Sequence, residues 1–182
     1  LSEKCKEHGA VLIMDEVQSG FGRTGKFFAH QWSNVQPDLI TTAKGMGNGF
    51  PVGAVLISPK FEPWFGMLGT TFGGAPLACA ASLAVLEVIE EEKLMNNINT
   101  IHQYITEELK HLDDIVEIRG KGLMIGIEMK YPIKDLRTKL INEYKILTGS
   151  SAQPNTIRLL PALNVSKDDA AKVISAFKEL CQ

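Results

Sequence analysis

The sequence predicts an α/β protein in which the first half forms a mixed or parallel sheet with helices and the second half a smaller α+β domain. Two largely apolar runs, 10–14 and 39–43, end in charged residues and are typical of strands buried in a sheet. A helical pattern opens at Pro76 and extends to about residue 96, as expected when Pro occupies the first turn of a helix. Beyond it, short strands and helices alternate, which indicates a second domain.

Other elements have their own signals. Residues 1–8 indicate the end of an amphipathic helix stopped by Gly9, and residues 52–58 a third apolar strand. Ser166 and the acids after it predict the cap of a last helix. The remaining elements are expected as helices at 98–112, 134–145 and from Ser166 to Cys181, and as strands at 115–119, 123–129 and 155–160. We place one domain boundary near residue 95, which gives domains at 1–94 and 95–182.

Composition and charge argue against several classes of protein. The 182 residues are 45% hydrophobic and 22% charged, with a formal net charge of −2, so neither disorder nor electrostatic nucleic-acid binding is expected. No apolar stretch reaches the roughly 20 residues of a bilayer span. The three cysteines and four histidines show no metal-ligand spacing. We therefore expect a cytoplasmic protein with no metal site, no nucleic-acid partner and no membrane association.

The start of the chain carries a prediction of its own. Residue 1 is Leu. The charged segment followed by an apolar segment that would indicate a signal peptide is not seen at the start of the sequence. A helix that begins at residue 1 without an N-cap predicts that the sequence is part of a longer chain.

Asp15 and Lys44 are the first candidate site residues. Each follows a predicted strand, and the carboxyl ends of parallel strands form the edge where open α/β sheets bind ligands. Loss of water there would favour the neutral, nucleophilic amine of Lys44. An acid beside an amine suits pyridoxal phosphate, whose ring nitrogen takes an anionic partner and whose aldehyde takes a lysine. The alternatives are that Asp15 and Glu16 only solvate the strand end and that Lys44 extends into water.

Two loops have features of phosphate sites. The segment 20–25, GFGRTG, matches the letters of the dinucleotide fingerprint GxGxxG, so a dinucleotide-binding module is an alternative from a different functional class. No helix is expected to open within it, which argues against that reading. Thr70 and Thr71, among the glycines of 69–74, offer hydroxyls and free amides to a phosphate, or form an ordinary turn.

Together these motifs carry a family resemblance. They are DEVQSGFGRTG at 15–25, PD at 37–38 with AKG at 43–45, GFPVGA at 49–54 and GTTFGG at 69–74. In this order and spacing they resemble the class III aminotransferases of the ornithine and acetylornithine type, and among these most closely the N-acylornithine aminotransferases. The resemblance implies a fold-type-I protein: the C-terminal part of the large cofactor-binding domain, then the small C-terminal domain. RGKGL at 119–123 and IRLLP at 157–161 are similar to that small domain.

The resemblance also implies roles around pyridoxal 5'-phosphate. Asp15 pairs with the pyridine nitrogen, and Val17 packs under the ring. Gln18 hydrogen-bonds the phenolic oxygen, and Lys44 binds the aldehyde covalently. These four residues would surround the ring of the cofactor.

Phosphate and substrate contacts follow from the same resemblance. Thr71, with help from Thr70, binds the phosphate of cofactor held mainly by the other subunit, which implies a homodimer with shared active sites. Arg158 clamps a substrate carboxylate, because a planar guanidinium suits that group; the alternative is a surface salt bridge. Many members have His before the Gly-Thr-Thr motif and Asn after Gly-Gly, where this chain has Leu68 and Ala75.

The implied reaction moves the amino group of N-acetylornithine or N-succinylornithine to 2-oxoglutarate, in arginine biosynthesis. Ornithine and 4-aminobutyrate aminotransferases are alternatives in the same class. The family's N-terminal half, with much of the substrate pocket, is absent from the sequence. We therefore expect the 182 residues alone to be inactive.

Overall fold

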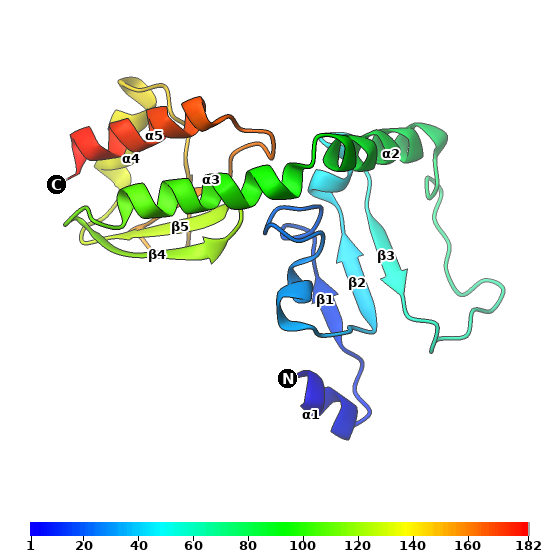
Figure 1. The fold of residues 1–182 in the computed structure, drawn as a ribbon. Helices are drawn as coiled ribbons and strands as arrows, with labels where there is room; N and C mark the ends of the chain where they lie inside the picture. Colours follow the sequence, from blue (N-terminus) through cyan, green and yellow to red (C-terminus); the bar gives the residue numbers. More distant parts are fainter. Residues whose placement is uncertain (182) are drawn as a thin grey trace. The chain divides into compact units, whose positions relative to one another are not determined.

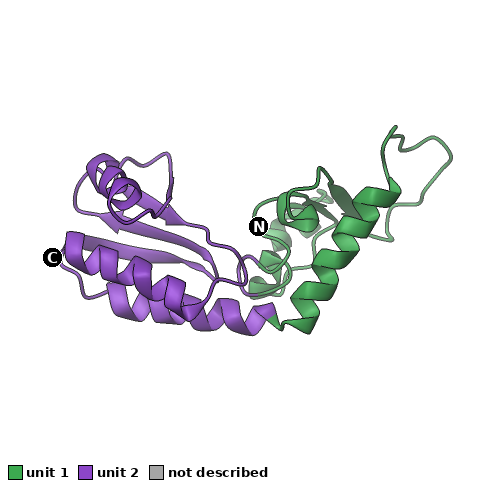
Figure 2. Cartoon of the chain, turned by 90° about the horizontal axis from the view of Figure 1, so that it is seen from above, with its two compact units in different colours: residues 1–22, 26–93 green, residues 23–25, 94–182 purple. Residues whose placement is uncertain are grey.

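The computed structural model describes residues 1–181 and forms two compact units (Figure 1, Figure 2). Unit 1 comprises residues 1–22 and 26–93, and unit 2 comprises residues 23–25 together with the chain from Leu94 onward. Residues 23–25 group with unit 2 although the residues on both sides of them belong to unit 1.

Unit 1 is built on a mixed three-stranded sheet in the order β1-β2-β3 (Figure 1). Strand β1 pairs parallel with β2, and β2 pairs antiparallel with β3. The elements in chain order are α1 (Ser2–Glu7), β1 (Ile13–Asp15), the 3₁₀ turn η1 (Ala29–Ser33), β2 (Leu39–Thr42), the 3₁₀ turn η2 (Lys44–Gly47), β3 (Ala54–Ile57) and α2 (Pro76–Glu91).

The strands of unit 1 are less buried than the sequence predicts. A continuous apolar run favours burial on both faces, but Ile13 in β1 is 54% exposed and Val55 in β3 is 53% exposed. Helix α2 likewise leaves Leu77 and Leu83 exposed. Within unit 1, therefore, the apolar run correctly marks the strand but not its burial, because no element of that unit covers these side chains.

Helix α2 also ends earlier than predicted. It stops at Glu91, and Lys93 takes a left-handed conformation with φ 50° before α3 begins. Acidic residues at a helix C-terminus oppose the helix dipole, and three of them, Glu90 to Glu92, stand here. This explains a stop that no Gly or Pro signals in the sequence.

Unit 2 has an antiparallel four-stranded sheet in the order β4-β5-β7-β6, and helices α3 and α5 pack together. Its elements are α3 (Leu94–Leu109), β4 (Ile115–Lys121), β5 (Met124–Met129), α4 (Lys134–Asn142), β6 (Gly149–Ser150), β7 (Thr156–Leu159) and α5 (Lys167–Leu180). Ile98, Ile127 and Phe177 are fully buried between these layers. Ser166 caps α5 as predicted, because its hydroxyl accepts a hydrogen bond from the Asp169 amide at 3.0 Å.

The segment 23–25 packs tightly against the turn between β4 and β5. Arg23 Nη1 donates to the carbonyls of Leu123, at 3.2 Å, and Pro161, at 2.5 Å. The Leu123 amide donates back to the Arg23 carbonyl at 2.9 Å. Burial lowers the pKa of the Arg23 guanidinium. Two hydrogen bonds from the Arg23 side chain and one between backbone groups therefore hold this segment in unit 2.

At Gly122 this packing leaves no room for a side chain. A Cβ there would lie 2.4 Å from the Thr24 carbonyl carbon and 2.6 Å from the Gly25 nitrogen, and its φ is +52°. We predict that Gly122→Ala lowers the free energy of unfolding of unit 2 by about 3 kcal/mol, from left-handed strain and overpacking. Gly126→Ala is the control, because its Cβ meets nothing closer than 3.6 Å. Urea unfolding measures both, and equal losses would contradict the prediction.

Candidate active site

The candidate site lies where β1 and β2 end side by side. The parallel register places Asp15 opposite Thr41, and Lys44 follows β2 after Ala43. The sequence expectation that Asp15 and Lys44 come from neighbouring parallel strands therefore agrees with the register. The two residues share the carboxyl edge of the sheet, which is where ligands bind in open α/β sheets.

Asp15 is held by its own loop and by the neighbouring strand. Its Oδ1 accepts hydrogen bonds from the Val17 amide, at 3.1 Å, and from Thr41 Oγ1, at 3.3 Å. Its second oxygen, Oδ2, has no partner among residues 1–181. One oxygen therefore fixes the carboxylate while the other is available to a cationic ring nitrogen.

Lys44 is exposed, so the expectation of a desolvated amine at a buried strand end is wrong for the described residues. The backbone turns into η2 at this point, and Lys44 itself has φ 45°. A side chain other than glycine in this region carries strain of roughly 1 kcal/mol. Its amine makes no ion pair or hydrogen bond within the described part of the chain. The lysine is therefore accessible, and water is not excluded from it by unit 1.

Glu16 is the residue whose role the sequence did not indicate. It is 3% exposed, and its carboxylate accepts bonds from the amides of Ala29, at 3.0 Å, and His30, at 2.8 Å. Ser19 Oγ and His30 Nδ1 contact it as well. Burial by itself raises the pKa of Glu16, but these hydrogen bonds outweigh burial and hold that pKa below its ordinary value. Glu16 is therefore an ionised anchor for the loop after Asp15.

The remaining cofactor candidates lie on loops of unit 1. Val17 is half-buried and Gln18 is exposed at the start of the loop that Glu16 anchors. Thr70 and Thr71 are exposed in the loop before α2, and neither hydroxyl has a hydrogen-bond partner among the described residues. A Cβ on Gly73 would lie 2.0 Å from Thr70 Cγ2, so a larger residue there would displace the Thr70 side chain. Leu68 in the same loop is also exposed.

Arg158 lies in unit 2, in a row of residues that crosses the sheet. The register pairs Arg119 with Gly126, Gly126 with Arg158, and Arg158 with Gly149. Directly opposed residues share a face, so two arginines alternate with two glycines on one side of the sheet. The glycines leave space beside the Arg158 side chain: a Cβ on Gly149 would lie 3.4 Å from Arg158 Cβ.

The two arginines of this row differ in their partners. Arg119 forms ion pairs with Glu117, at 2.8 Å, and with Glu128, and these raise its pKa. Arg158 has no carboxylate within ion-pair distance among residues 1–181, and its Nε is buried without a hydrogen-bond partner. The alternative of a surface salt bridge at Arg158 is therefore not seen in the described residues. A buried guanidinium nitrogen without a partner favours a ligand carboxylate.

The GFGRTG loop does not form a dinucleotide site. Residues 20–25 are turns, no helix begins within them, and η1 starts only at Ala29. A helix N-terminus at this motif is what binds a pyrophosphate. Phe21 and Phe28 are buried beside the loop, with ring centroids 6.5 Å apart. The segment is therefore occupied by packing rather than open to a nucleotide.

No group of three or more His, Cys, Asp or Glu residues in 1–181 is arranged to hold a metal ion. No helix in the same range has the length and apolar character to cross a membrane.

Comparison with known proteins identifies the family of this chain. The family model for aminotransferase class-III matches residues 1–181. The chain belongs to this family. It is 44% identical over 184 residues to acetylornithine aminotransferase of Nitrosomonas europaea, which covers 97% of the chain and 46% of that protein. It is 43% identical over 176 residues to acetylornithine aminotransferase 1 of Bordetella bronchiseptica, which covers 93% of the chain and 44% of that protein.

Solved structures show the same fold. The crystal structure of acetylornithine aminotransferase from Elizabethkingia anophelis aligns with a TM-score of 0.83 at 30% identity, covering 98% of this chain and 47% of that one. An S-selective transaminase from Bacillus megaterium aligns with a TM-score of 0.87 at 32% identity, covering 96% and 44%. The predicted family and fold-type-I fold are confirmed. The chain spans less than half the length of the curated relatives it matches.

Pyridoxal 5'-phosphate is the cofactor of class III aminotransferases, and the residues of this chain fit it. Asp15 keeps one carboxylate oxygen free for a ring nitrogen, and the Lys44 amine is free to join an aldehyde. Both residues stand at one edge of one sheet. The donor set therefore matches the two ends of the pyridoxal ring.

Glu16 gives a pH-dependent prediction about stability. We expect Glu16→Gln to lower the free energy of unfolding by about 2 kcal/mol at neutral pH. The NH₂ group of glutamine would face backbone N–H donors that now bond to a carboxylate oxygen. Since the folded pKa of Glu16 is depressed, its contribution is present above about pH 4.5 and is lost as the pH falls through the folded value. Urea unfolding at neutral pH and below about pH 4.5 measures this. The difference in free energy of unfolding between variant and wild type should be smaller in acid.

The control is Glu62→Gln, the same substitution at an exposed glutamate of unit 1. If Glu16→Gln and Glu62→Gln lose equal stability at neutral pH, Glu16 is not an anchor. A gap that stays constant from neutral to acid pH would also contradict this role.

Proposed function

We propose that this chain carries the cofactor lysine and the carboxylate clamp of an aminotransferase. The complete enzyme moves the amino group of N-acetylornithine, or of N-succinylornithine, to 2-oxoglutarate in the cytoplasm, as a step of arginine biosynthesis. The observation that carries the proposal is the shared sheet edge of Asp15 and Lys44, each with a free polar group. The name of the relatives, acetylornithine aminotransferase, supports the choice of substrate.

The residues divide the chemistry between them. Bound pyridoxal phosphate supplies an aldehyde that joins amines and a ring that withdraws electrons. Asp15 Oδ2 would hold a proton on the ring nitrogen and keep the ring cationic. The register with Thr41 and the hydrogen bond from Val17 orient that carboxylate. Lys44 Nζ would join the aldehyde carbon with loss of water, and, once the amino donor has displaced it from that carbon, the freed amine would take the proton from Cα of the donor.

Val17 and Gln18 are proposed to complete the ring contacts. Both follow Asp15 on the loop that the Glu16 carboxylate holds. Val17 would pack under the ring, and Gln18 would bond the phenolic oxygen. Arg158, with its unpartnered Nε, would bind a substrate carboxylate such as those of 2-oxoglutarate.

We also propose that the active enzyme is a homodimer with shared sites. Thr70 and Thr71 have no partner for their hydroxyls in the described chain, and they would bind the phosphate of cofactor held mainly by the other subunit. The segment around them exposes large apolar side chains, namely Trp64, Phe65, Leu68 and Phe72. Such a cluster is typical of a surface that another chain covers.

Cofactor labelling tests the assignment of Lys44. We expect that adding pyridoxal phosphate, reducing with borohydride and mapping peptides by mass finds the modification at Lys44 in preference to other lysines. Lys44→Ala should abolish this selective label and the visible absorbance of lysine-bound cofactor. Lys60→Ala, at another exposed lysine of unit 1, should change neither. Labelling spread over surface lysines, with or without Lys44, would contradict the assignment.

Turnover is tested after the chain has been combined with the N-terminal half of a relative. The chain is co-expressed with the N-terminal half of the Nitrosomonas europaea relative, and N-acetylornithine, N-succinylornithine, ornithine and 4-aminobutyrate are compared with 2-oxoglutarate as acceptor. We expect an acylornithine to give the highest kcat/KM. If Lys44 is labelled selectively but acylornithines are not turned over, the proposed substrate is wrong and the proposed cofactor site still stands.

Arg158 is tested in the same assembly. We expect Arg158→Lys to raise KM for 2-oxoglutarate about tenfold or more, because a bidentate contact is lost. Arg119→Lys is the matched control, since Arg119 lies in the same row but is already paired with Glu117 and Glu128. Equal changes in KM for the two variants would contradict the clamp.

A further inference from the structure

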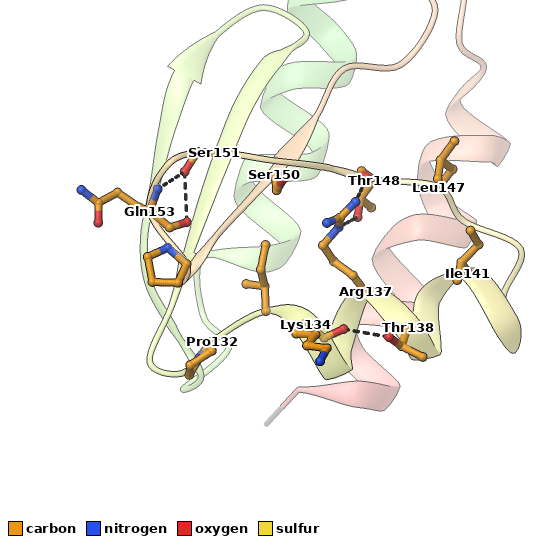
Figure 3. A pocket seen from close by; sticks show the side chains of 12 residues that line it. Pro132, Lys134, Arg137, Thr138, Ile141, Leu147, Thr148, Ser150, Ser151 and Gln153 are labelled. Carbon is orange, nitrogen blue, oxygen red and sulfur yellow. Dashed lines mark hydrogen bonds between the residues drawn. The ribbon is translucent and has the colours of Figure 1, made fainter.

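Unit 2 contains a cavity that is separate from every residue proposed above for the cofactor or the substrate. Its volume is about 450 Å³, and it lies between α4 and the segment from Leu147 to Pro154 (Figure 3). Its lining contains no residue of unit 1 and does not include Arg158. A ligand here is therefore independent of the proposed aminotransferase site.

The polar side of this cavity is cationic and hydroxyl-rich. Lys134 and Arg137 line it from the same face of α4, together with Thr138, and no acidic side chain is in the lining. Neither cation lies within ion-pair distance of a carboxylate of the described chain. Like charges at i and i+3 on a helix repel each other. An anion bound between them would relieve that repulsion.

Arg137 is fixed in position before any ligand binds. Its Nη2 donates to the Thr148 carbonyl at 2.7 Å, and its Nε contacts Thr148 Oγ1 at 3.3 Å. Figure 3 shows the guanidinium between α4 and the segment before β6 that carries Thr148. Its Nη1 has no hydrogen-bond partner among residues 1–181. A held guanidinium with a free edge loses little rotamer freedom when it binds an oxyanion.

Other side chains of the lining complete a two-sided site. Ser151 Oγ donates to the Gln153 carbonyl at 3.2 Å and accepts from the Gln153 amide at 3.0 Å, which shapes the far rim. Ile141 and Leu147 are exposed at the other end of the cavity. The cavity thus offers two cations between a polar rim at Ser151 and Gln153 and an apolar wall at Ile141 and Leu147 (Figure 3).

We propose that this cavity binds a small organic anion. The carboxylate or phosphate group of the ligand contacts Arg137 and Lys134, and a short apolar body lies on Ile141 and Leu147. Both head groups match a guanidinium edge with nearby donors, so they share one recognition chemistry.

Titration of the ¹⁵N-labelled chain tests the site, with inorganic phosphate, acetate and hexanoate as probes. Saturable shifts are expected at the backbone amides of Thr138, Thr148, Ser150 and Ser151. The tighter of phosphate and acetate identifies the preferred head group, and hexanoate should bind more tightly than acetate. We expect Arg137→Gln to weaken binding about tenfold, the scale of a lost charge-assisted hydrogen bond, and Lys134→Gln to weaken it as well.

Lys139→Gln is the matched control, because it removes the same charge from α4 at a residue outside the lining. The amide spectrum of each variant shows whether it is folded, and Lys134→Gln keeps the test valid if Arg137→Gln unfolds. The absence of saturable shifts would overturn the proposal. Equal weakening of anion binding by Arg137→Gln, Lys134→Gln and Lys139→Gln would also overturn it, because only the net charge would then matter. If hexanoate binds no more tightly than acetate, the proposed contact of the ligand with Ile141 and Leu147 is wrong.

Discussion

The parallel pairing of β1 with β2 is the constraint on which the candidate site depends. It places Asp15 opposite Thr41 and so puts the start of η2, at Lys44, on the same sheet edge. A parallel pair requires a long crossover, and here residues 16–38 supply it. Glu16 ties the start of that crossover to β2 and to its middle: its amide donates to the Thr41 carbonyl, and its carboxylate accepts from the amides of Ala29 and His30. A buried, ionised carboxylate thus stabilises the loop that presents Asp15, Val17 and Gln18.

Much of this fold is readable from local signals. Apolar runs mark β1 and β2, Pro76 marks the start of α2, and Ser166 marks the cap of α5, because each depends on residues close in sequence. Other features depend on distant residues and were missed. An apolar run does not encode strand direction, so the antiparallel pairing of β3 was not predicted. The two residues of β6 are too few to give a pattern. Exposure of Lys44 depends on what covers the sheet edge, which its neighbours in sequence do not show.

The site shows the same division between local and distant information. A resemblance of motifs nominated Asp15, Lys44 and Arg158, but only sheet register separates an arginine without a carboxylate partner from a salt-bridged one. Arg119 and Arg158 lie in one row, and the two glutamates beside Arg119 satisfy it while Arg158 stands between two glycines. The pairing is invisible in sequence because the residues come from different strands. Glu16 was missed for the opposite reason: next to Asp15 it looked like a second solvated acid, and its donors arrive from residues 29 and 30.

The two units differ in how far their own residues complete a core, and this difference bears on function. In unit 2, Ile98 and Phe177 are fully buried, so the register that positions Arg158 is supported by packing within the unit. In unit 1, Ile13, Val55 and Leu83 are exposed, and apolar burial there contributes less to stability. The residues proposed for the cofactor all lie in unit 1, where hydrogen bonds to Glu16 and Asp15 compensate in part for the missing apolar contacts. Any chain that covers the apolar side chains of unit 1 would therefore stabilise the sheet edge at Asp15 and Lys44, while the position of Arg158 is already fixed by the packing of unit 2.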